Sequence, residues 1–527
     1  MAGQPDGHIF RSPFPDVAIP SIPLTDLVLH QATALKDKPA FIDGPSGRTL
    51  TFGQVAAGVR RMAAGLSRRG FGKGDVLALW SPNLPEFAVA FHAVALLGGI
   101  VTTANPLNTA EEFARQLRDS GATLVVTIPA LLPKAREAAT DTRVRELFVF
   151  GEAEGATPVS ALLAETGDPP SVAIDPAVDV VALPYSSGTT GLPKGVMLTH
   201  RNLTANLLQT EAVERLPEDD VLIAVLPYYH IYGMTVVLNL GLYSGATQIV
   251  LPRFDLESFL GLMQRYAVTN ACLVPPIVLA LAKHPAVDQF DLSKLRVITS
   301  GAAPLSAELS IACEQRLGCV VKQGYGMTEL SPVTHITPEA RNRPGSIGLL
   351  IPNTECLVAD LSTGAALPPG EAGEIWIRGP QVMKGYLNDA AATAHTIDSE
   401  GWLHTGDIGS GDADGYFHIV DRLKELIKFK GYQVPPAELE AVLLTHPRVA
   451  DAAVIGIPDE EAGEVPKAFV VRRDDCSADE LMAYVAERVS PYKRIRQLEF
   501  LESIPKSSSG KILRIALIER ERQAAHS

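Results

Sequence analysis

The sequence has few cysteines, no excess of positive charge and no long apolar run. Its five cysteines are odd in number and form no C-x-x-C pair, which argues against a disulfide framework or a zinc site. The net charge of −14 argues against nucleic acid or an anionic membrane surface as the main partner. The longest apolar run, 87–101, contains His92 and is shorter than the ~20 residues of a membrane span, so it predicts a buried helix.

Targeting signals are absent at both ends as well. The N-terminus has no basic stretch followed by an apolar core, and the C-terminus carries no peroxisomal tripeptide. We therefore expect a cytoplasmic protein with reduced thiols and no membrane span, acting as a monomer or homodimer.

The sequence does contain a long alternation of helical and β-rich segments. With 527 residues, the chain is long enough for about three units of ~150 residues. Short Val/Ile/Leu runs that end in Gly, Ser or Pro are typical of strands covered by helices on both faces; they occur at 125–128, 147–150, 221–227, 246–252 and 296–301. Helices at 113–120 and 255–266 fit between them. The fold class is α/β, with mixed, mostly parallel sheets.

The pattern changes after about residue 370 to shorter, alternating strands. Asp412 to Gly415 predicts a hairpin turn between two of them, rather than a calcium loop, because the later Glu of such a loop is missing. Past Lys424 comes a βα-type segment and a further helix at 478–489. We predict two domains, a large one at 1–423 and a small, mobile α+β one at 424–527.

A phosphate-binding loop is predicted at 181–195. An apolar strand leads into hydroxyl and glycine residues that end in a lysine, namely Ser186, Ser187, Gly188, Thr189, Thr190, Gly191 and Lys194. Such a loop turns backbone N–H groups toward a phosphate and adds a point charge. It is not a Walker A motif, because Pro193 stands where that pattern needs glycine. A plain Ser/Thr/Gly surface loop is the alternative.

With this loop and five further motifs in the same order, the sequence resembles the adenylate-forming superfamily of acyl-CoA synthetases, luciferases and peptide-synthetase adenylation domains. The further motifs are QGYGMTE at 323–329, GEIWIRG at 373–379, WLHTGD at 402–407, DRLKELIKFKGYQ at 421–433 and PKSSSGK at 505–511. The residues of these motifs are most similar to those of the 4-coumarate:CoA ligase-like branch. The resemblance implies the adenylate-forming enzyme fold, with a small C-terminal lid domain.

The resemblance implies a reaction in two steps that uses ATP, Mg²⁺ and coenzyme A. A carboxylate attacks the α-phosphorus of ATP to give acyl-AMP and pyrophosphate, and the thiol of coenzyme A then displaces AMP. Lys511 would bridge the carboxylate and the α-phosphate, and Glu329 with Thr190 would hold Mg²⁺. Besides the loop, the residues implied to bind ATP or AMP are Gln323, Gly324, Tyr325, Gly326, Thr328, Asp407 and Arg422.

For the second step, the resemblance implies that the small domain rotates about Lys424. Lys428 and Gln433 would then replace Lys511 at the site, while Arg253, Lys430 and Gly431 would contact coenzyme A. Solvated lysines are the alternative for this face. The acyl pocket would have His230 as a gate at its carboxylate end and be lined by His230, Tyr232, Val236, Ser300, Gly301, Ala302, Gln323, Gly324, Leu330, Ser331, Pro332 and Val333.

The acid itself stays open at this stage. A mostly apolar pocket with few polar anchors fits a small hydrophobic acid. Leu330 stands where plant hydroxycinnamate enzymes usually have Ala, and Val236 where they often have Ser, which puts a hydroxylated ring in doubt. The prediction is an AMP-forming acid:CoA ligase for a 4-coumarate- or cinnamate-like acid of phenylpropanoid type. The alternatives are a medium-chain fatty acyl-CoA synthetase, a luciferase-like oxygenase and a silent adenylate binder.

Overall fold

Two large mixed sheets form the centre of the fold, as the alternating pattern predicts. The computed structural model describes residues 8–186, 193–423, 425–430, 432–459, 462–507 and 510–525, without the side chains of 432, 433, 524 and 525. The first sheet runs in the order β10 (Tyr185–Ser186), β11 (Lys194–Thr199), β9 (Val180–Ala182), β5 (Ile100–Thr103), β4 (Val76–Trp80), β6 (Leu124–Thr127), β7 (Glu146–Val149), β8 (Thr157–Pro158), with β21 (Gly385–Tyr386) paired to β11.

The second sheet supplies most of the strand ends that form the candidate site described in the next subsection. Its order is β18 (Leu349–Leu350), β17 (Val333–Ile336), β16 (Val320–Gly326), β15 (Val297–Ser300), β14 (Asn270–Leu273), β12 (Val221–Ala224), β13 (Thr247–Val250), β2 (Pro39–Asp43), β3 (Thr49–Thr51). The pairs from β2 to β16 are parallel, and the edge pairs are antiparallel. Ligands of such sheets bind beyond the carboxyl ends of the parallel strands.

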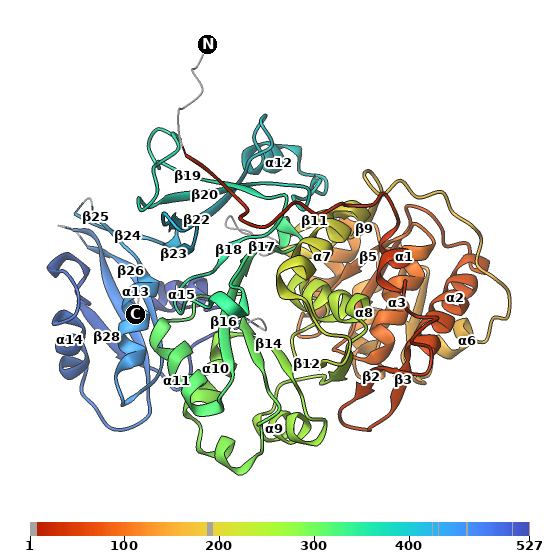
Figure 1. The fold of residues 1–527 in the computed structure, drawn as a ribbon, viewed down its shortest axis with the longest axis horizontal. Coiled ribbons are helices and arrows are strands. Elements are labelled where there is room, and N and C mark those ends of the chain that lie inside the picture. The colour runs from red at the N-terminus through yellow and green to blue at the C-terminus, as the bar shows by residue number, and fades with distance from the viewer. Residues whose placement is uncertain are drawn as a thin grey trace.

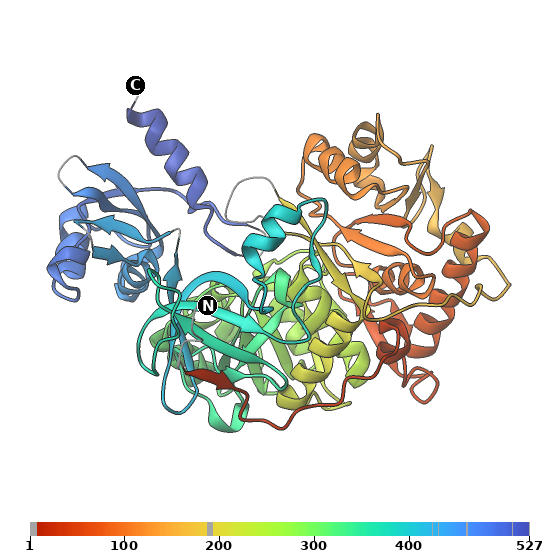
Figure 2. The ribbon, with the colours of Figure 1, turned by 90° about the horizontal axis from the view of Figure 1, so that it is seen from above.

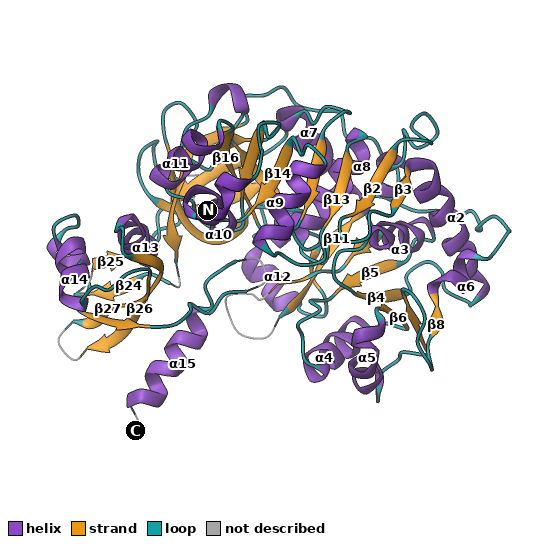
Figure 3. Cartoon of the chain, turned by 90° about the horizontal axis from the view of Figure 1, so that it is seen from below, coloured by secondary structure: helices purple, strands orange, loops and turns teal. Residues whose placement is uncertain are grey.

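Helices cover these sheets, and half of them begin with a capping side chain. Thr51, Thr109 and Thr199 each form a capping box, in which the side chain accepts from the third backbone N–H of the helix. Figure 3 shows the helices packed around the strands. The helices are α1 (Leu24–Val28), α2 (Phe52–Arg68), α3 (Pro85–Leu96), α4 (Ala110–Ser120), α5 (Leu132–Ala139), α6 (Val159–Leu163), α7 (His200–Glu214), α8 (Leu240–Ser244), α9 (Leu256–Arg265), α10 (Pro275–Lys283), α11 (Ala307–Leu317) and α12 (Ala390–Thr396).

The apolar run 87–101 is only partly helical, which corrects the prediction of one buried helix. Helix α3 ends at Leu96, a turn through Gly98 follows, and β5 begins at Ile100. Gly98 has φ +65°, a conformation that favours glycine and stops the helix. Since both α3 and β5 are buried, the apolar pattern alone could not distinguish them. Among the described residues, no helix combines the length and the apolar character that a membrane crossing needs.

The alternating strands after residue 370 form a third, antiparallel sheet. Its order is β1 (Ile9–Arg11), β19 (Glu355–Ala359), β20 (Gly373–Arg378), β22 (Leu403–Gly411), β23 (Phe417–Arg422). The predicted hairpin turn at Asp412 is confirmed: its Oδ1 accepts from the backbone N–H groups of Asp414 and Tyr416. The N-terminal strand β1, which the sequence did not predict, closes the other edge of this sheet, as Figure 1 shows.

A small lobe, which we define as the described residues from Glu425 onward, has its own sheet and core. The sheet runs β25 (Tyr432–Val434), β24 (Ile427–Phe429), β27 (Gly463–Arg472), β26 (Val449–Asp459), with β28 (Gln497–Phe500) on β27. Its apolar cluster contains residues from Ile427 to Ile495. The helices are α13 (Pro436–Thr445), α14 (Ala478–Ala486) and α15 (Arg514–Ala525), and Figure 2 shows α15 projecting away from the molecule. The described residues up to Leu423 are called the large lobe.

Three buried histidines predict that the large lobe is sensitive to acid. Burial lowers the pKa of His92 and His200 to about 4 and that of His335 to about 3. The unfolded chain then binds more protons below pH ~6.5, so stability falls as the pH drops from ~6.5 toward 4, by up to ~1.4 kcal/mol per pH unit for each histidine.

We expect His200→Asn to reduce this slope. The ring nitrogen Nδ1 of His200 accepts from the backbone N–H of Leu24 at 3.1 Å, and the Asn oxygen replaces that acceptor without titrating. Urea unfolding at pH 7 and 5, followed by tryptophan fluorescence, measures the large lobe, because the three tryptophans (Trp80, Trp376 and Trp402) all lie in it. An unchanged pH dependence in the variant would contradict the assignment to His200.

Candidate active site

The predicted phosphate loop connects two antiparallel strands, and a carboxylate binds its base. Ser187, Gly188, Thr189, Thr190 and Gly191 lie outside the described residues. The two flanking residues, Ser186 at the end of β10 and Lys194 at the start of β11, are register partners. The hydroxyl of Ser186 donates to Glu329 Oε1 at 2.8 Å. The base of the loop is therefore tied to the QGYGMTE segment, more than a hundred residues away in the sequence.

Glu329 is the centre of a polar cluster at the carboxyl end of β16. It lies in the short 3-10 helix Thr328–Leu330 and is 4% exposed. The hydroxyl of Tyr386, on β21, donates to the same Oε1 at 2.9 Å. Lys194 Nζ lies 3.4 Å from Asp389 Oδ2 and 5.1 Å from the ring centroid of Tyr386. Sequence reasoning missed Tyr386 and Asp389, because both lie outside the recognised motifs.

Asp407 joins two of the other predicted nucleotide residues. Asp407 and Arg422 are register partners on β22 and β23, and Arg422 Nε lies 3.0 Å from Asp407 Oδ1. The hydroxyl of Tyr325 donates to Asp407 Oδ2 at 2.5 Å. The charge of Asp407 raises the pKa of Arg422, and burial raises the pKa of Tyr325 well above its usual value. Arg422 therefore stays charged and the Tyr325 hydroxyl stays protonated near neutral pH.

The remaining residues of the QGYGMTE motif give β16 its shape. The side-chain oxygen of Gln323 accepts from the backbone N–H of Leu305, which fixes the loop after β15. Gly324 pairs with Ile336 of β17. A Cβ at Gly326 would lie 2.1 Å from the carbonyl oxygen of Pro332, so only glycine fits there. Thr328 begins the turn that presents Glu329.

Lys511 reaches this cluster from the small lobe. Its charge interacts with Arg422, Asp407 and Glu329 of the large lobe and with Glu425. Burial lowers the pKa of Lys511, and Arg422 acts in the same direction, while the carboxylates oppose both. The loop before it also contacts the large lobe, since a Cβ on Gly510 would lie 3.3 Å from two ring atoms of Pro276. The structure therefore brings Lys511 together with the predicted ATP-binding residues.

His230 and Tyr232 lie at the carboxyl ends of the parallel strands of the second sheet. Burial, followed by the charge of Lys511, lowers the pKa of His230 to about 4, so the imidazole is neutral at pH 7. The hydroxyl of Tyr232 donates to the carbonyl of Thr299 at 2.9 Å. Tyr232 precedes a π-helix, Gly233–Asn239, which contains the buried Val236; π-helical turns are frequent at functional sites.

Of the other predicted pocket residues, Gly301 lies against Tyr232, and the rest are placed by their own contacts. A Cβ on Gly301 would lie 2.9 Å from Tyr232 Cε1, and Val333 belongs to the same apolar core as Val236. Pro332 and Val333 are held next to α7, because Asn206 bonds both backbone groups of Val333. Ser300 is buried at the end of β15, Ala302 follows with φ +70°, and Ser331 donates to the carbonyl of Gln381.

Leu330 does not lie with this group. It is fully buried in the apolar cluster of the antiparallel sheet, together with Phe10, Cys356 and Phe417. Its bulk therefore fills that core, and the inference that it narrows the pocket at the ring has no support from the fold.

The residues predicted for coenzyme A are not brought together with the site. Lys428 and Lys430 are exposed on and beside β24, and Arg253 is exposed before α9. β24 and β25 lie apart from α9 in both Figure 1 and Figure 3. Lys424 and Gly431 lie outside the described residues, and Gln433 is described only as backbone of β25.

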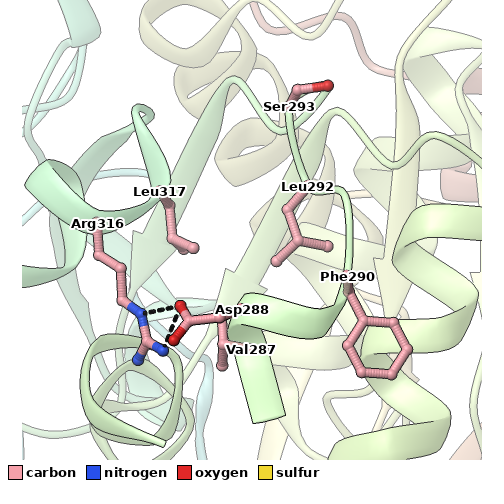
Figure 4. Close-up of a pocket in the computed structure, with 7 residues that line it drawn as sticks. All are labelled: Val287, Asp288, Phe290, Leu292, Ser293, Arg316 and Leu317. Atoms are coloured by element: carbon pink, nitrogen blue, oxygen red, sulfur yellow. Dashed lines mark hydrogen bonds and ion pairs between the residues drawn. The ribbon is translucent and has the colours of Figure 1, made fainter. Parts of the chain in front are cut away.

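A separate small pocket lies near η3 (Pro285–Gln289) and the end of α11. Figure 4 shows Arg316 and Asp288 pointing toward one another, with Nη2 and Oδ1 2.7 Å apart. Ser293 and Leu317 shortly precede β15 and β16, so this pocket is at the amino end of the sheet, opposite the candidate site. Arg316 also donates to two backbone carbonyls, and we interpret this pocket as structural.

A prediction follows from the Tyr325 hydroxyl. Tyr325→Phe removes its hydrogen bond to Asp407 but keeps the ring, and it leaves the ion pair between Asp407 and Arg422 in place. Because hydrogen bonds to charged groups contribute ~1.5 kcal/mol or more, we expect KM for ATP to rise about tenfold with kcat changed much less. Initial rates of AMP release at varied ATP measure both constants. An equal fall in kcat would mean that the hydroxyl acts in the chemistry instead.

Comparison with known proteins places this arrangement in context. Residues 28–387 match the model of the AMP-binding enzyme family, and residues 438–511 match that of the AMP-binding enzyme C-terminal domain. The chain is 49% identical to a 4-coumarate–CoA ligase of Oryza sativa subsp. japonica, over 98% of this chain and 97% of that protein. It is 46% identical to a 4-coumarate:CoA ligase of Petunia hybrida, over 96% and 95%.

A solved structure has the same fold. The crystal structure of an anthranilate CoA ligase in complex with anthranoyl-AMP matches with a TM-score of 0.89 and 27% identity. The match covers 97% of this chain and 99% of that one. The similarity therefore includes both lobes.

Proposed function

Because this chain belongs to the AMP-binding enzyme family, we propose that its two lobes activate a small cinnamate-like acid at the cluster around Glu329, Asp407 and Lys511. The chain is an AMP-forming acid:CoA ligase, which uses ATP to convert a carboxylic acid to acyl-AMP and then transfers the acyl group to coenzyme A. The roles of individual residues and the identity of the acid are our proposals.

The observation that carries the assignment of residues is the electrostatic interaction of the buried Lys511 with Asp407, Arg422 and Glu329. Adenylation brings a carboxylate against the α-phosphate, so negative charge gathers between two anionic groups. A positioned cation lowers the cost of that approach. Lysine suits this role because it is a compact charge on a flexible stem. We propose that Lys511 bridges the two groups, that Asp407 with Arg422 binds the ribose, and that Lys194 and its loop bind phosphate.

Glu329 fits the proposed magnesium ion. In the part of the chain that the structure describes, no three or more His, Cys, Asp or Glu side chains cluster as a metal site would need. A nucleotide-bound Mg²⁺ needs few protein oxygens, since phosphates and waters complete its shell. Both described hydrogen bonds of the Glu329 carboxylate fall on Oε1, which leaves Oε2 for the ion. Bound Mg²⁺ would neutralise the pyrophosphate leaving group.

For the second step we propose that the small lobe rotates about Lys424, with domains at 1–423 and 424–527. In the structure Lys511 lies at the cluster and Lys428 is exposed, an arrangement suited to adenylation. After rotation, Lys428 and Gln433 would take the place of Lys511, and Arg253, Lys430 and Gly431 would contact coenzyme A. The neutral imidazole of His230 would gate the carboxylate end of the pocket.

The proposed acid is 4-coumarate- or cinnamate-like, as in phenylpropanoid metabolism. The two relatives compared above are ligases of 4-coumarate, and the ring of Tyr232 lies against Gly301, which leaves a flat, apolar wall. We also propose a cytoplasmic enzyme that is a monomer or homodimer, and the five free cysteines are compatible with a reducing compartment.

A panel of acids tests this proposal. AMP release would be measured with and without coenzyme A for cinnamic, 4-coumaric, benzoic and octanoic acids. We expect coenzyme-A-dependent release that is fastest with cinnamic or 4-coumaric acid. Fastest release with octanoic acid would favour a medium-chain fatty acyl-CoA synthetase. AMP release that requires oxygen and emits light would favour a luciferase-like reaction.

A further inference from the structure

A buried ion pair that no motif contains lies next to the proposed acyl pocket. Lys322 is on β16, and Glu214 is the last residue of α7. Lys322 Nζ and Glu214 Oε2 are 2.6 Å apart, and the two side chains are 0% and 4% exposed. Removing either partner would leave an uncompensated charge in the interior, which is strongly unfavourable. The pair is therefore a fixed feature of the interior.

Hydrogen bonds connect this pair to Tyr232. The hydroxyl of Thr299 donates to Glu214 Oε1 at 3.2 Å, and the backbone carbonyl of Thr299 accepts from the Tyr232 hydroxyl at 2.9 Å. The ring of Tyr232 lies beside Gly301, two residues after Thr299. The hydroxyl of Tyr232 thus points toward Thr299, the residue whose side chain donates a hydrogen bond to the ion pair.

The sheet register places the pair on one face with Tyr232. Cys272, Thr299 and Lys322 are consecutive register partners on β14, β15 and β16, so their side chains share a face. The thiol of Cys272 and the Tyr232 hydroxyl interact, and burial raises the pKa of both. Beyond the Tyr232 ring, this face therefore presents a hydroxyl, a thiol and two charges in place of aliphatic side chains.

We propose that the Glu214–Lys322 pair forms the end wall of the acyl pocket and limits the length of the acid that the enzyme accepts. The inference rests on the proposed function, because it takes Tyr232 as a pocket residue. A ring substituent that extends past Tyr232 meets the charged pair, so its methylene groups gain little from leaving water. Displacing one charge to make room would leave the other unpaired. Both effects disfavour long acids.

The test compares cinnamic acid with 4-butylcinnamic acid, whose para chain extends the ring. For the unsubstituted full-length protein, we expect kcat/KM with 4-butylcinnamic acid to be at least about tenfold lower. The double substitution Glu214→Gln with Lys322→Met removes both charges, conserves volume and keeps an oxygen acceptor for Thr299. We expect it to raise the ratio of 4-butylcinnamic to cinnamic acid about tenfold. Coenzyme-A-dependent AMP release gives both values.

A matched control uses the same residue types in the small lobe. Lys467 Nζ and Glu521 Oε1 are also 2.6 Å apart, and Lys467→Met with Glu521→Gln should leave the ratio unchanged. Equal use of both acids by the unsubstituted protein overturns the inference, whether or not the double variant folds. A folded Glu214→Gln, Lys322→Met variant with an unchanged ratio also overturns it. No AMP release with either acid contradicts the proposed acid class and removes the premise as well.

Discussion

Replacing Lys511 by alanine is expected to lower the rate of acyl-AMP formation by about a thousandfold. Lys511 is the cation that the small lobe adds to Asp407, Arg422 and Glu329, whereas Lys506 of the same loop pairs with Asp451. Transfer from supplied acyl-AMP to coenzyme A should change by less than about threefold, because we propose that the lysine is withdrawn in that step. Pyrophosphate exchange measures the first half-reaction, and thioester absorbance measures the second.

Two further variants test whether this loss depends on the position and the shape of the Lys511 charge. Lys506→Ala removes another lysine of the same loop, one whose Nζ pairs with Asp451 at 2.6 Å within the small lobe, and it should cost adenylation far less. Lys511→Arg keeps the charge but changes its shape, so partial activity is expected. Equal losses in both half-reactions of Lys511→Ala would point to a folding defect or to a different role, and would contradict the bridging assignment.

The α/β fold could be predicted because its signals are local. The predicted strands at 125–128, 147–150 and 296–301 and the predicted helices at 113–120 and 255–266 each appear within three residues of the predicted position. Continuous apolar runs define buried strands, and turns and caps define their ends. The same locality explains the error at 87–101. A buried helix and a buried strand follow one another there, and both are apolar on all sides.

The candidate site could be predicted only where recognised motifs contain both partners of a contact. Asp407 and Arg422 lie in adjacent motifs, and the structure joins them across one strand pair. Glu214 and Lys322 are 108 residues apart, and each alone has the pattern of an ordinary surface charge. Only the packing of α7 against β15 and β16 reveals the pair. For Leu330 the position beside a motif suggested a pocket residue, whereas the structure packs its side chain in the apolar cluster of the antiparallel sheet.

The position of the small lobe depends on a few contacts across residue 424. The backbone N–H of Ala437 donates to Asp421 Oδ2 at 3.0 Å, and Lys283 Nζ donates to the carbonyl of Leu444 at 3.3 Å. Arg514 binds Glu425 and Glu440 within the small lobe, close to Asp421. The rotation that we propose would break these contacts between the lobes.

Lys428→Ala is expected to show the reverse of the Lys511 result. Lys428 is exposed on β24, and its backbone N–H donates to Glu464 Oε2 at 2.8 Å, so the strand stays fixed when the side chain is truncated. Acyl-AMP formation should be unchanged within about threefold, whereas thioester formation should fall about a hundredfold, since a positioned cation is lost from the second step only. Acyl-AMP should therefore accumulate, which chromatography of the quenched reaction would detect.

The matched control is Arg494→Ala, which removes another exposed cation of the small lobe and should leave both half-reactions near their original rates.

Together, the Lys428→Ala and Lys511→Ala variants test the rotation itself. If each lysine acts in one step only, neither variant can carry out the full reaction. In a mixture, however, free acyl-AMP made by the Lys428→Ala protein can be used by the Lys511→Ala protein. Thioester formed by the mixture, and by neither variant alone, would establish that the two steps use different faces of one lobe. A Lys428→Ala protein that loses acyl-AMP formation as well would contradict the alternation, because Lys428 would then act in both steps.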